Sequence, residues 1–234
     1  MLLLAFETSA KAASVALFDG ETLLGESYQN TGLTHSQTLM VMAEDLIKQC
    51  RKTVNDITAV AVAEGPGSFT GVRIGVAAAK GFAWGKELPC YGISTLEAMA
   101  LSLGAWEGHV CACMDARRSQ VYNAVFYVNQ GALERISDDR AISLAELKTE
   151  LEHIDGPIFL VGDGAELTCK TLSEDIPNLI LPPEHRRHQR AVGVALLAEK
   201  KAAAGESGDG NALSPNYLRL SQAERERAEK MQNA

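Results

Sequence analysis

The sequence predicts an α/β fold with mixed strand directions, divided into two lobes near residue 100. In the first hundred residues, segments typical of strands and helices follow one another in the order β-β-β-α-β-α-β-α. The run 57–63 is continuously apolar, which is typical of a strand buried on both faces. Strand and helix patterns continue more loosely after residue 100. A smaller second lobe is therefore expected over residues 101–220, with its C-terminal helix free to pack back on the first lobe 1–100.

The first lobe is expected to begin with a β-meander. Three short runs separated by turn residues have strand character: residues 2–6, 13–18 and 22–28. Thr34 and Gln37 have the spacing of a capping box, and apolar residues at helical intervals follow them, which predicts a helix up to about residue 50. The turn 64–68 then opens a second helix over Phe69–Trp84. A strand is predicted at 90–93, and another capping box predicts a helix near residue 95.

The second lobe has fewer clear signals. Strands are predicted at residues 110–114, 120–128 and 158–161. Ser143 and Glu146 form a further capping-box pattern, and strong helix formers at 191–204 predict a helix that ends at Gly205. Residues 221–234 carry many charges and little to bury, so a polar tail is expected there, as a frayed helix or as disorder.

Composition and charge narrow the classes of function. At 46% hydrophobic residues, the 234-residue chain can bury a sizeable core. Its net charge of −8 argues against gripping a phosphate backbone across the whole surface, so contact with nucleic acid is expected to be local or made by a partner. The five cysteines fit reduced thiols. The apolar runs are shorter than the roughly 20 residues that cross a bilayer, and the N-terminus lacks the basic residues that begin a signal peptide. The sequence therefore predicts a cytoplasmic protein with no membrane contact.

The sharpest local motif is Gly65-Pro66-Gly67-Ser68 at the start of the second predicted helix. Backbone N–H groups at a helix N-terminus can bind phosphate, and Arg73 and Lys80 on one helix face would suit an anion. The Gly-Lys-Ser/Thr of a P-loop does not follow. A tight strand-to-helix turn with solvated charges is the favoured interpretation.

A second group of candidates lies at strand ends. Glu7-Thr8-Ser9 follows the first strand, and Gly162 and Gly164 follow the strand at 158–161. These residues are weak candidates for nucleotide binding, because ordinary turn chemistry explains them equally well. Three strands with a small polar turn after the first also resemble the actin-like, Hsp70-like and sugar-kinase (ASKHA) superfamily.

The first two predicted helices carry a wide apolar surface. The apolar positions of the first cover an arc of roughly 160°, where about 100° is enough for a helix that covers its own sheet. The second has a stripe of small residues that includes Gly71, Gly75 and Ala78. Surplus apolar surface predicts a protein–protein interface, with Met40 and Met42 adaptable at its edge. A deep core remains an equal alternative.

The sequence resembles the TsaB (YeaZ) family over essentially the whole chain up to about residue 220. The specific match is the string from Gly65 to Gly75, Gly-Pro-Gly-Ser-Phe-Thr-Gly-Val-Arg-Ile-Gly. Supporting matches are Glu7-Thr8-Ser9, His35, Met114-Asp115-Ala116-Arg117 with Val121-Tyr122, and Pro215-Asn216-Tyr217-Leu218-Arg219.

The resemblance implies the ASKHA fold, with two lobes and mixed sheets, and a non-catalytic role. It implies a partner of a TsaD-like catalytic subunit and a TsaE-like ATPase in making threonylcarbamoyladenosine (t6A) in tRNA, with no catalytic residue and no cofactor on this chain. Contact with tRNA would be indirect or local. Alone, the chain is expected to form a homodimer through the same face. The interface is expected on the first two helices: His35, Leu39, Met40, Met42, Leu46, Ile47, Phe69, Gly71, Arg73, Gly75 and Ala78.

The resemblance also implies that no metal is bound. The catalytic subunits of this type carry two metal-binding histidines, and the matching positions here are Thr95 and Met99, which suit no activating metal. The residues alone leave two alternatives open. One is an ATPase or kinase that uses Glu7, Thr8 and the turn 162–164; the other is a glycoprotease-type metallopeptidase.

Overall fold

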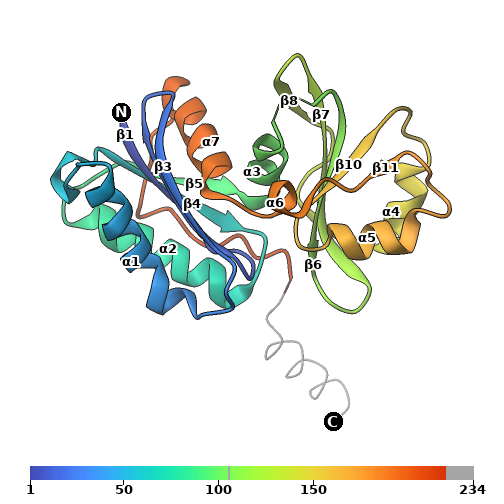
Figure 1. The fold of residues 1–234 in the computed structure, drawn as a ribbon, viewed down its shortest axis with the longest axis horizontal. Helices are drawn as coiled ribbons and strands as arrows, with labels where there is room; N and C mark the ends of the chain where they lie inside the picture. Colours follow the sequence, from blue (N-terminus) through green and yellow to red (C-terminus); the bar gives the residue numbers. More distant parts are fainter. Residues whose placement is uncertain (105, 220–234) are drawn as a thin grey trace, which may run out of the picture.

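The computed structural model describes residues 1–104 and 106–219, which form two lobes, each built on its own mixed β-sheet (Figure 1). This confirms the predicted α/β fold with two lobes. The polar tail expected at 221–234 lies outside the described residues.

The sheet of the N-terminal lobe has the strand order β3-β2-β1-β4-β5. Its strands are β1 (Leu2–Glu7), β2 (Ala13–Asp19), β3 (Thr22–Gln29), β4 (Ala59–Gly65) and β5 (Cys90–Ser94). β1, β2 and β3 pair antiparallel as the predicted meander, whereas β4 runs parallel to both β1 and β5. All six residues of β1 are buried, because helices cover both faces of the sheet.

Two helices cover one face of this sheet and a third covers the other (Figure 1). α1 (His35–Gln49) and α2 (Phe69–Trp84) share a core with the inward side chains of β1, β2 and β4. α7 (Ala191–Ala203), from the far end of the chain, packs on the opposite face. Leu213, which follows α7 in the chain, joins the core under α1 and α2. Residues from the C-terminal part of the chain therefore pack on both faces of the N-terminal sheet.

The second lobe has the strand order β11-β10-β6-β7-β8, with β9 paired to β7. The strands are β6 (Gly108–Asp115), β7 (Gln120–Asn129), β8 (Ala132–Arg135), β9 (Arg140–Ser143), β10 (Ile158–Val161) and β11 (Leu179–Ile180). The helices around them are α3 (Thr95–Ser102), α4 (Leu144–Leu151), α5 (Ala165–Leu172) and the short α6 (Glu184–Arg187). α3 packs its Leu96 and Met99 on one face of this sheet and also contacts α7, so it joins the two lobes.

Most predicted elements are confirmed to within about two residues, and α2 has the predicted bounds. The capping predictions had mixed outcomes. Ser143 and Glu146 form the full capping box, and Ser94 caps α3 by accepting a hydrogen bond from the Glu97 N–H. Thr34 makes no side-chain capping hydrogen bond, so that prediction was wrong. Among the described residues, no helix combines the length and apolar character needed to cross a membrane.

Candidate functional site: the inter-lobe cleft and the outer face of α2

A polar cleft of about 510 Å³ lies where the two lobes meet. Its walls come from the ends of β1 and β6, the Gly-Pro-Gly-Ser turn before α2, and the C-terminal residues 216–219. Both signs of charge line it, including Lys11, Asp115, Arg117, Asp163 and Arg219. Two separately predicted segments, the turn after β1 and the turn after β10, therefore meet at one cleft.

Glu7, the last residue of β1, is buried two residues before Ser9 of the cleft wall. Its Oε1 accepts a hydrogen bond from the Ser9 N–H at 2.6 Å, while Oε2 has no partner among the described residues. Burial raises the pKa of Glu7 from 4.5 to about 7, and the Asp163 carboxylate adds to the increase. Glu7 is therefore divided between its neutral and charged forms near neutral pH.

Thr8 and Ser9 hold α2 against the end of β1. The Thr8 hydroxyl donates to the Gly71 carbonyl at 2.8 Å, and the Ser68 N–H donates to the Ser9 carbonyl at 2.6 Å. A Cβ at Gly71 would lie 2.1 Å from the Thr8 carbonyl oxygen, and one at Gly75 would lie 2.4 Å from the Thr8 hydroxyl oxygen. These contacts explain why both helix positions are glycine.

The same contacts correct one prediction. Gly71 and Gly75 were expected to form a stripe for a partner, but both are buried and face β1 of their own lobe. The reason is that α2 starts directly above the end of β1, where only glycine lets the two backbones approach.

Gly162 and Gly164 also serve close packing. A Cβ at Gly162 would lie 2.1 Å from the Cys113 carbonyl oxygen, and one at Gly164 would lie 2.9 Å from the Asp115 nitrogen. Between them, Asp163 accepts a hydrogen bond from the Gln189 side chain at 2.9 Å. Nucleotide binding by these residues stays a prediction, because their packing role explains the glycines without a ligand.

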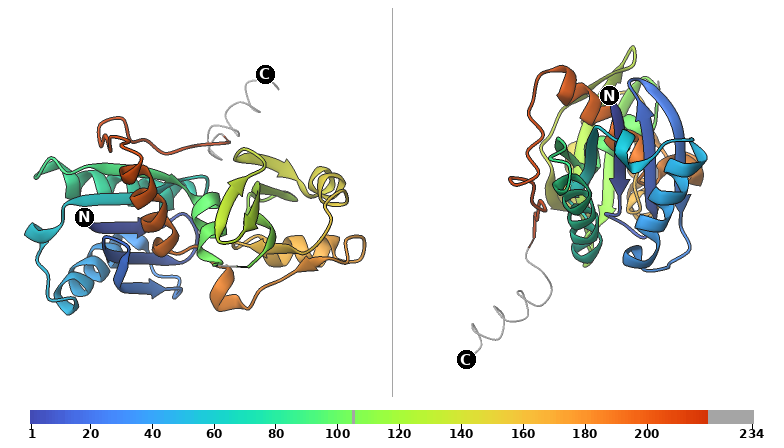
Figure 2. Two further views of the ribbon diagram at one scale, coloured as in Figure 1. Left: turned by 90° about the horizontal axis from the view of Figure 1, so that it is seen from above. Right: turned by 90° about the vertical axis from the view of Figure 1, so that its left-hand side faces the viewer.

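The C-terminal strap, residues 213–219, crosses the mouth of the cleft. Figure 2 shows the chain after α7, of which the strap is the last part, running along the first lobe toward the second. The Asn216 N–H donates to the Glu64 carbonyl at 2.6 Å, and Arg219 Nη1 donates to the Ala116 carbonyl of the second lobe at 2.6 Å. The strap thus contacts both lobes, although local sequence patterns carry no sign of this bridge.

The strap also meets the first turns of α2. The Tyr217 ring stacks on the Phe69 ring, with centroids 4.7 Å apart, and Tyr217 Oη accepts a hydrogen bond from Arg73 Nε at 2.7 Å. The Arg73 guanidinium carbon lies 3.8 Å from the Phe69 ring centroid. Phe69 and Arg73, two predicted interface residues, therefore form a surface cluster with the strap.

The predicted interface on α1 needs a larger correction. Four of its members are buried in the core of their own lobe and are at most 5% exposed: Leu39, Met42, Leu46 and Ile47. The wide apolar side of α1 is buried within its own lobe because α1 packs against both the sheet and α2. His35 is half-buried at the start of α1, where its Nε2 donates to the Ala10 carbonyl at 2.8 Å.

The exposed remainder of this face is narrower and lies mainly on α2. On α1, Met40 is 44% exposed, whereas Val41, 56% exposed, lies on the other side of the helix and lines a pocket with residues of β3. On α2, Ile74, Ala78 and Phe82 are half-buried beside the core. Four residues form an exposed stripe along the outer face of the helix, which we call the α2 stripe: Arg73, Ala77, Gly81 and Trp84.

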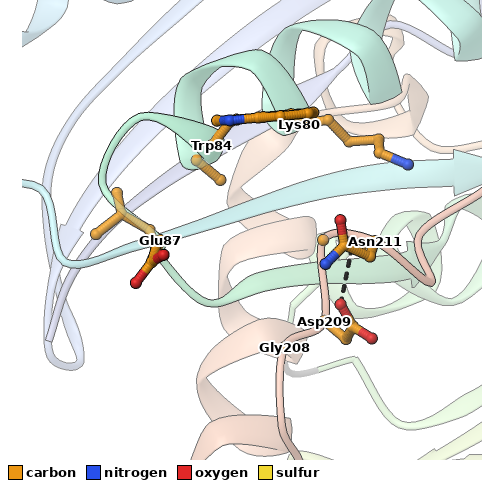
Figure 3. A pocket seen from close by; sticks show the side chains of 9 residues that line it. Lys80, Trp84, Glu87, Gly208, Asp209 and Asn211 are labelled. Carbon is orange, nitrogen blue, oxygen red and sulfur yellow. Dashed lines mark hydrogen bonds between the residues drawn. The ribbon is translucent and has the colours of Figure 1, made fainter.

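The α2 stripe ends beside a second pocket, of about 440 Å³ (Figure 3). Lys80 and Trp84 lie on its helical side, and the loop with Asp209 and Asn211 lies opposite them. The Asn211 N–H donates to the Asp209 carboxylate at 2.8 Å, and Lys80 Nζ donates to the Leu213 carbonyl at 3.0 Å. Trp84 is 81% exposed, a large apolar surface left in water.

Other charged clusters are occupied by internal pairs. In the basic stretch 185–190, Arg190 binds the Glu26 carboxylate and Arg187 lies 3.6 Å from Glu166. Within residues 1–104 and 106–219, no group of three His, Cys, Asp or Glu side chains is placed to hold a metal ion.

Comparison with known proteins identifies the relatives of this chain. A family model described as TsaD, tRNA N6-adenosine threonylcarbamoyltransferase, matches residues 29–226. The chain is 33% identical over 226 residues to the tRNA threonylcarbamoyladenosine biosynthesis protein TsaB of Bacillus subtilis, covering 96% of both chains. The solved structure of YeaZ from Pseudomonas aeruginosa is similar, with a TM-score of 0.71 and 26% sequence identity, covering 92% of this chain and 99% of that one.

A more distant structure shows the shared fold. Component A of the (R)-2-hydroxyglutaryl-CoA dehydratase of Acidaminococcus fermentans has a TM-score of 0.53 and 13% identity, covering 87% of this chain and 99% of that one. The α/β fold with two lobes and mixed sheets, expected to be of the actin-like/Hsp70-like/sugar-kinase (ASKHA) type from the first three strands and from the family resemblance, is confirmed.

Proposed function

Because the chain belongs to the TsaB family of tRNA threonylcarbamoyladenosine biosynthesis proteins, we propose that it is the non-catalytic subunit that binds and supports a TsaD-like catalytic subunit. The observation that carries this proposal is the similarity to Bacillus subtilis TsaB over 96% of both chains. The role requires no cofactor and no catalytic residue on this chain.

The docking surface that we propose is the exposed part of the α1–α2 face. Ala77 and Gly81 lie in the middle of the α2 stripe, and a Cβ at Gly81 would meet no atom of the described structure within 4 Å. Small residues in open space let a partner helix approach the backbone closely. Trp84 at one end, with Met40 on α1, adds exposed apolar surface whose burial would favour association.

Further parts of the proposal concern the assembly. In the absence of the catalytic subunit, the same face would pair with a second copy about a two-fold axis. A TsaE-like ATPase would be the other protein partner. The net charge of −8 favours indirect or local contact with tRNA. The five free cysteines are compatible with a reducing compartment, and we propose a cytoplasmic location.

Substitutions on the α2 stripe test the proposal. Ala77→Glu and Gly81→Glu each place a charged side chain in the proposed interface, without a steric clash at Gly81 within the chain. Ala145→Glu, on the exposed face of α4 in the second lobe, is the matched control. Each variant is co-purified with the TsaD-like subunit of the same organism, and t6A in tRNA is measured in a reconstituted reaction.

We expect wild type and Ala145→Glu to bind the catalytic subunit and support t6A formation. Ala77→Glu and Gly81→Glu should lose both, while their circular dichroism spectra and melting temperatures remain close to those of wild type. Complex formation and modification that survive both substitutions would reject this docking surface. Failure of the wild-type chain to bind the subunit would reject the proposed role itself.

A further inference from the structure

Arg73 is held in one orientation on the surface of α2. Phe69, one helical turn before it, lies under the flat face of its guanidinium, 3.8 Å from the ring centroid to the guanidinium carbon. Tyr217 of the strap accepts the Nε–H at 2.7 Å and lies with its ring centroid 5.6 Å from the same carbon. The stacked rings of Phe69 and Tyr217 thus support the guanidinium on one side and one edge.

The support for Tyr217 comes from its neighbours in the chain. The Asn216 N–H is bound to the Glu64 carbonyl, and Arg219 is bound to the Ala116 carbonyl. Tyr217 is therefore fixed from both sides of the sequence, so its hydroxyl is a well-placed acceptor. A guanidinium held in this way loses less conformational entropy when it binds a ligand.

The two terminal nitrogens of Arg73 are left without a ligand. Nη1 and Nη2 form no hydrogen bond or ion pair with the residues that the structure describes. Three other arginines, Arg135, Arg140 and Arg190, each bind a carboxylate of their own chain. The Nη1–Nη2 edge is the part of a guanidinium that binds a planar oxyanion with two parallel hydrogen bonds.

We propose that Arg73, oriented by Phe69 and Tyr217, is a preformed site for a carboxylate side chain of the catalytic subunit. This inference rests on the proposed function and names the chemistry of the partner at one end of the α2 stripe. Arg73, Ala77 and Gly81 are four residues apart along one side of the helix. A partner helix that passes over the two small residues would bring an Asp or Glu within reach of Arg73.

A protein carboxylate fits better here than a phosphate of tRNA. The chain carries a net charge of −8, so a polyanion would approach a single arginine against the field of the whole molecule. A single carboxylate on a partner surface carries only one charge, and the apolar contacts along the α2 stripe would hold it in place.

Affinity measurements with conservative variants test this site. The dissociation constant of the complex with the TsaD-like subunit is measured by calorimetry at several salt concentrations, with inter-subunit affinity as the readout. Arg73→Lys keeps the charge but loses the two-pronged geometry, and Tyr217→Phe keeps the ring stacking but removes the acceptor for Nε. Arg186→Lys, at an exposed arginine of α6, is the control.

We expect Arg73→Lys to weaken the complex at least tenfold, Tyr217→Phe to weaken it several-fold, and Arg186→Lys to leave it unchanged. Arg73→Glu should abolish binding, and Asp or Glu→Lys changes on the catalytic subunit should include one that restores it. The melting temperature of the isolated chain distinguishes a binding role of Arg73 from a structural one. If Arg73 only held the strap, its substitution would lower the melting temperature, and no charge reversal on the catalytic subunit would restore binding.

The outcomes separate the two proposals. If wild type binds, Ala77→Glu does not, and both Arg73→Lys and Tyr217→Phe bind like wild type, the carboxylate site is wrong and the docking surface stands. If Arg73→Lys weakens the binding of tRNA to the assembled complex and leaves the affinity between the subunits unchanged, the ligand is a phosphate and the inference is overturned.

Discussion

The inter-lobe cleft and the outer face of α2 use small residues in opposite ways. Beside the cleft, Thr8 occupies the space that a side chain at Gly71 or Gly75 would need. Glycine at these two positions therefore allows close packing within the lobe. On the outer face, Ala77 is exposed and Gly81 has open space around it. The two environments alternate along a single helix.

The residues of the sequence motifs lie at or beside the cleft, yet most of them are engaged in contacts within the chain. Thr8 binds Gly71, Ser9 binds Ser68, and the strap crosses the entrance. On the outer face only Arg73 belongs to a sequence motif; exposed Trp84 lies outside it, and Nη1 and Nη2 of Arg73 have no partner among the described residues. A motif can therefore record a packing requirement, while the binding surface lies beside it.

The largest expected effect comes from one substitution made on each side of α2. Gly71→Ala should lower the free energy of unfolding by about 3 kcal/mol, since the new Cβ would clash with the Thr8 carbonyl. Gly81→Ala should stabilise the chain by up to about 1 kcal/mol, because alanine favours helix and nothing blocks it. Urea unfolding of both variants measures the difference. Equal effects of the two substitutions would remove the distinction between the buried and open sides.

Adjacent residues of α1 provide the next test. Leu39→Ala should destabilise the chain by about 3 kcal/mol because it leaves a cavity in the core, whereas Met40→Ala should change stability by no more than about 0.5 kcal/mol. Met40→Ala should instead weaken binding to the catalytic subunit. Thermal unfolding and calorimetric titration measure the two properties separately. A binding defect of Leu39→Ala without loss of stability would return Leu39 to the interface.

A third expected effect is a pH dependence of stability caused by Glu7. Its folded-state pKa of about 7 lies above its ordinary value of 4.5, so the folded state holds the proton more strongly than the unfolded state. Glu7 therefore contributes stability below pH 4.5 that is lost as the pH rises to about 7, up to about 3 kcal/mol in total. Ionised Glu7 is the destabilising form.

Glu7→Gln should remove this pH dependence. Relative to wild type, the variant should gain stability between pH 5 and pH 8, as measured by urea unfolding at both values. Glu174→Gln, at an exposed glutamate, is the control and should follow wild type at both. A constant difference between Glu7→Gln and wild type across the pH range would show that Glu7 does not titrate there.

Sequence patterns predicted the helices and strands well, but they predicted poorly which parts of the chain pack against each of them. The bounds of α2 were predictable because a glycine turn and the Ser68 cap mark its start. Helical periodicity correctly identified the apolar side of α1, but it cannot show whether that side is covered by the same chain, and Leu39 and Leu46 were misplaced for this reason.

Residues that meet from distant parts of the chain were the hardest to predict. Arg73 and Tyr217 are 144 positions apart, and no spacing rule connects them. The resemblance to a family marked both segments as motifs without indicating that they touch. β8, β9 and α5 were missed because each is short and lies in a lobe with few turn and capping signals.

The position of α7 and Leu213 has a consequence for how the protein is made. The sheet formed by the first hundred residues needs α7 on one face and Leu213 in the core of the other. During translation, the N-terminal lobe emerges from the ribosome with these places empty and apolar side chains open to water. Its folding can finish only after nearly the whole chain has been synthesised, so we expect nascent chains halted before α7 to expose the apolar surface that α7 and Leu213 cover.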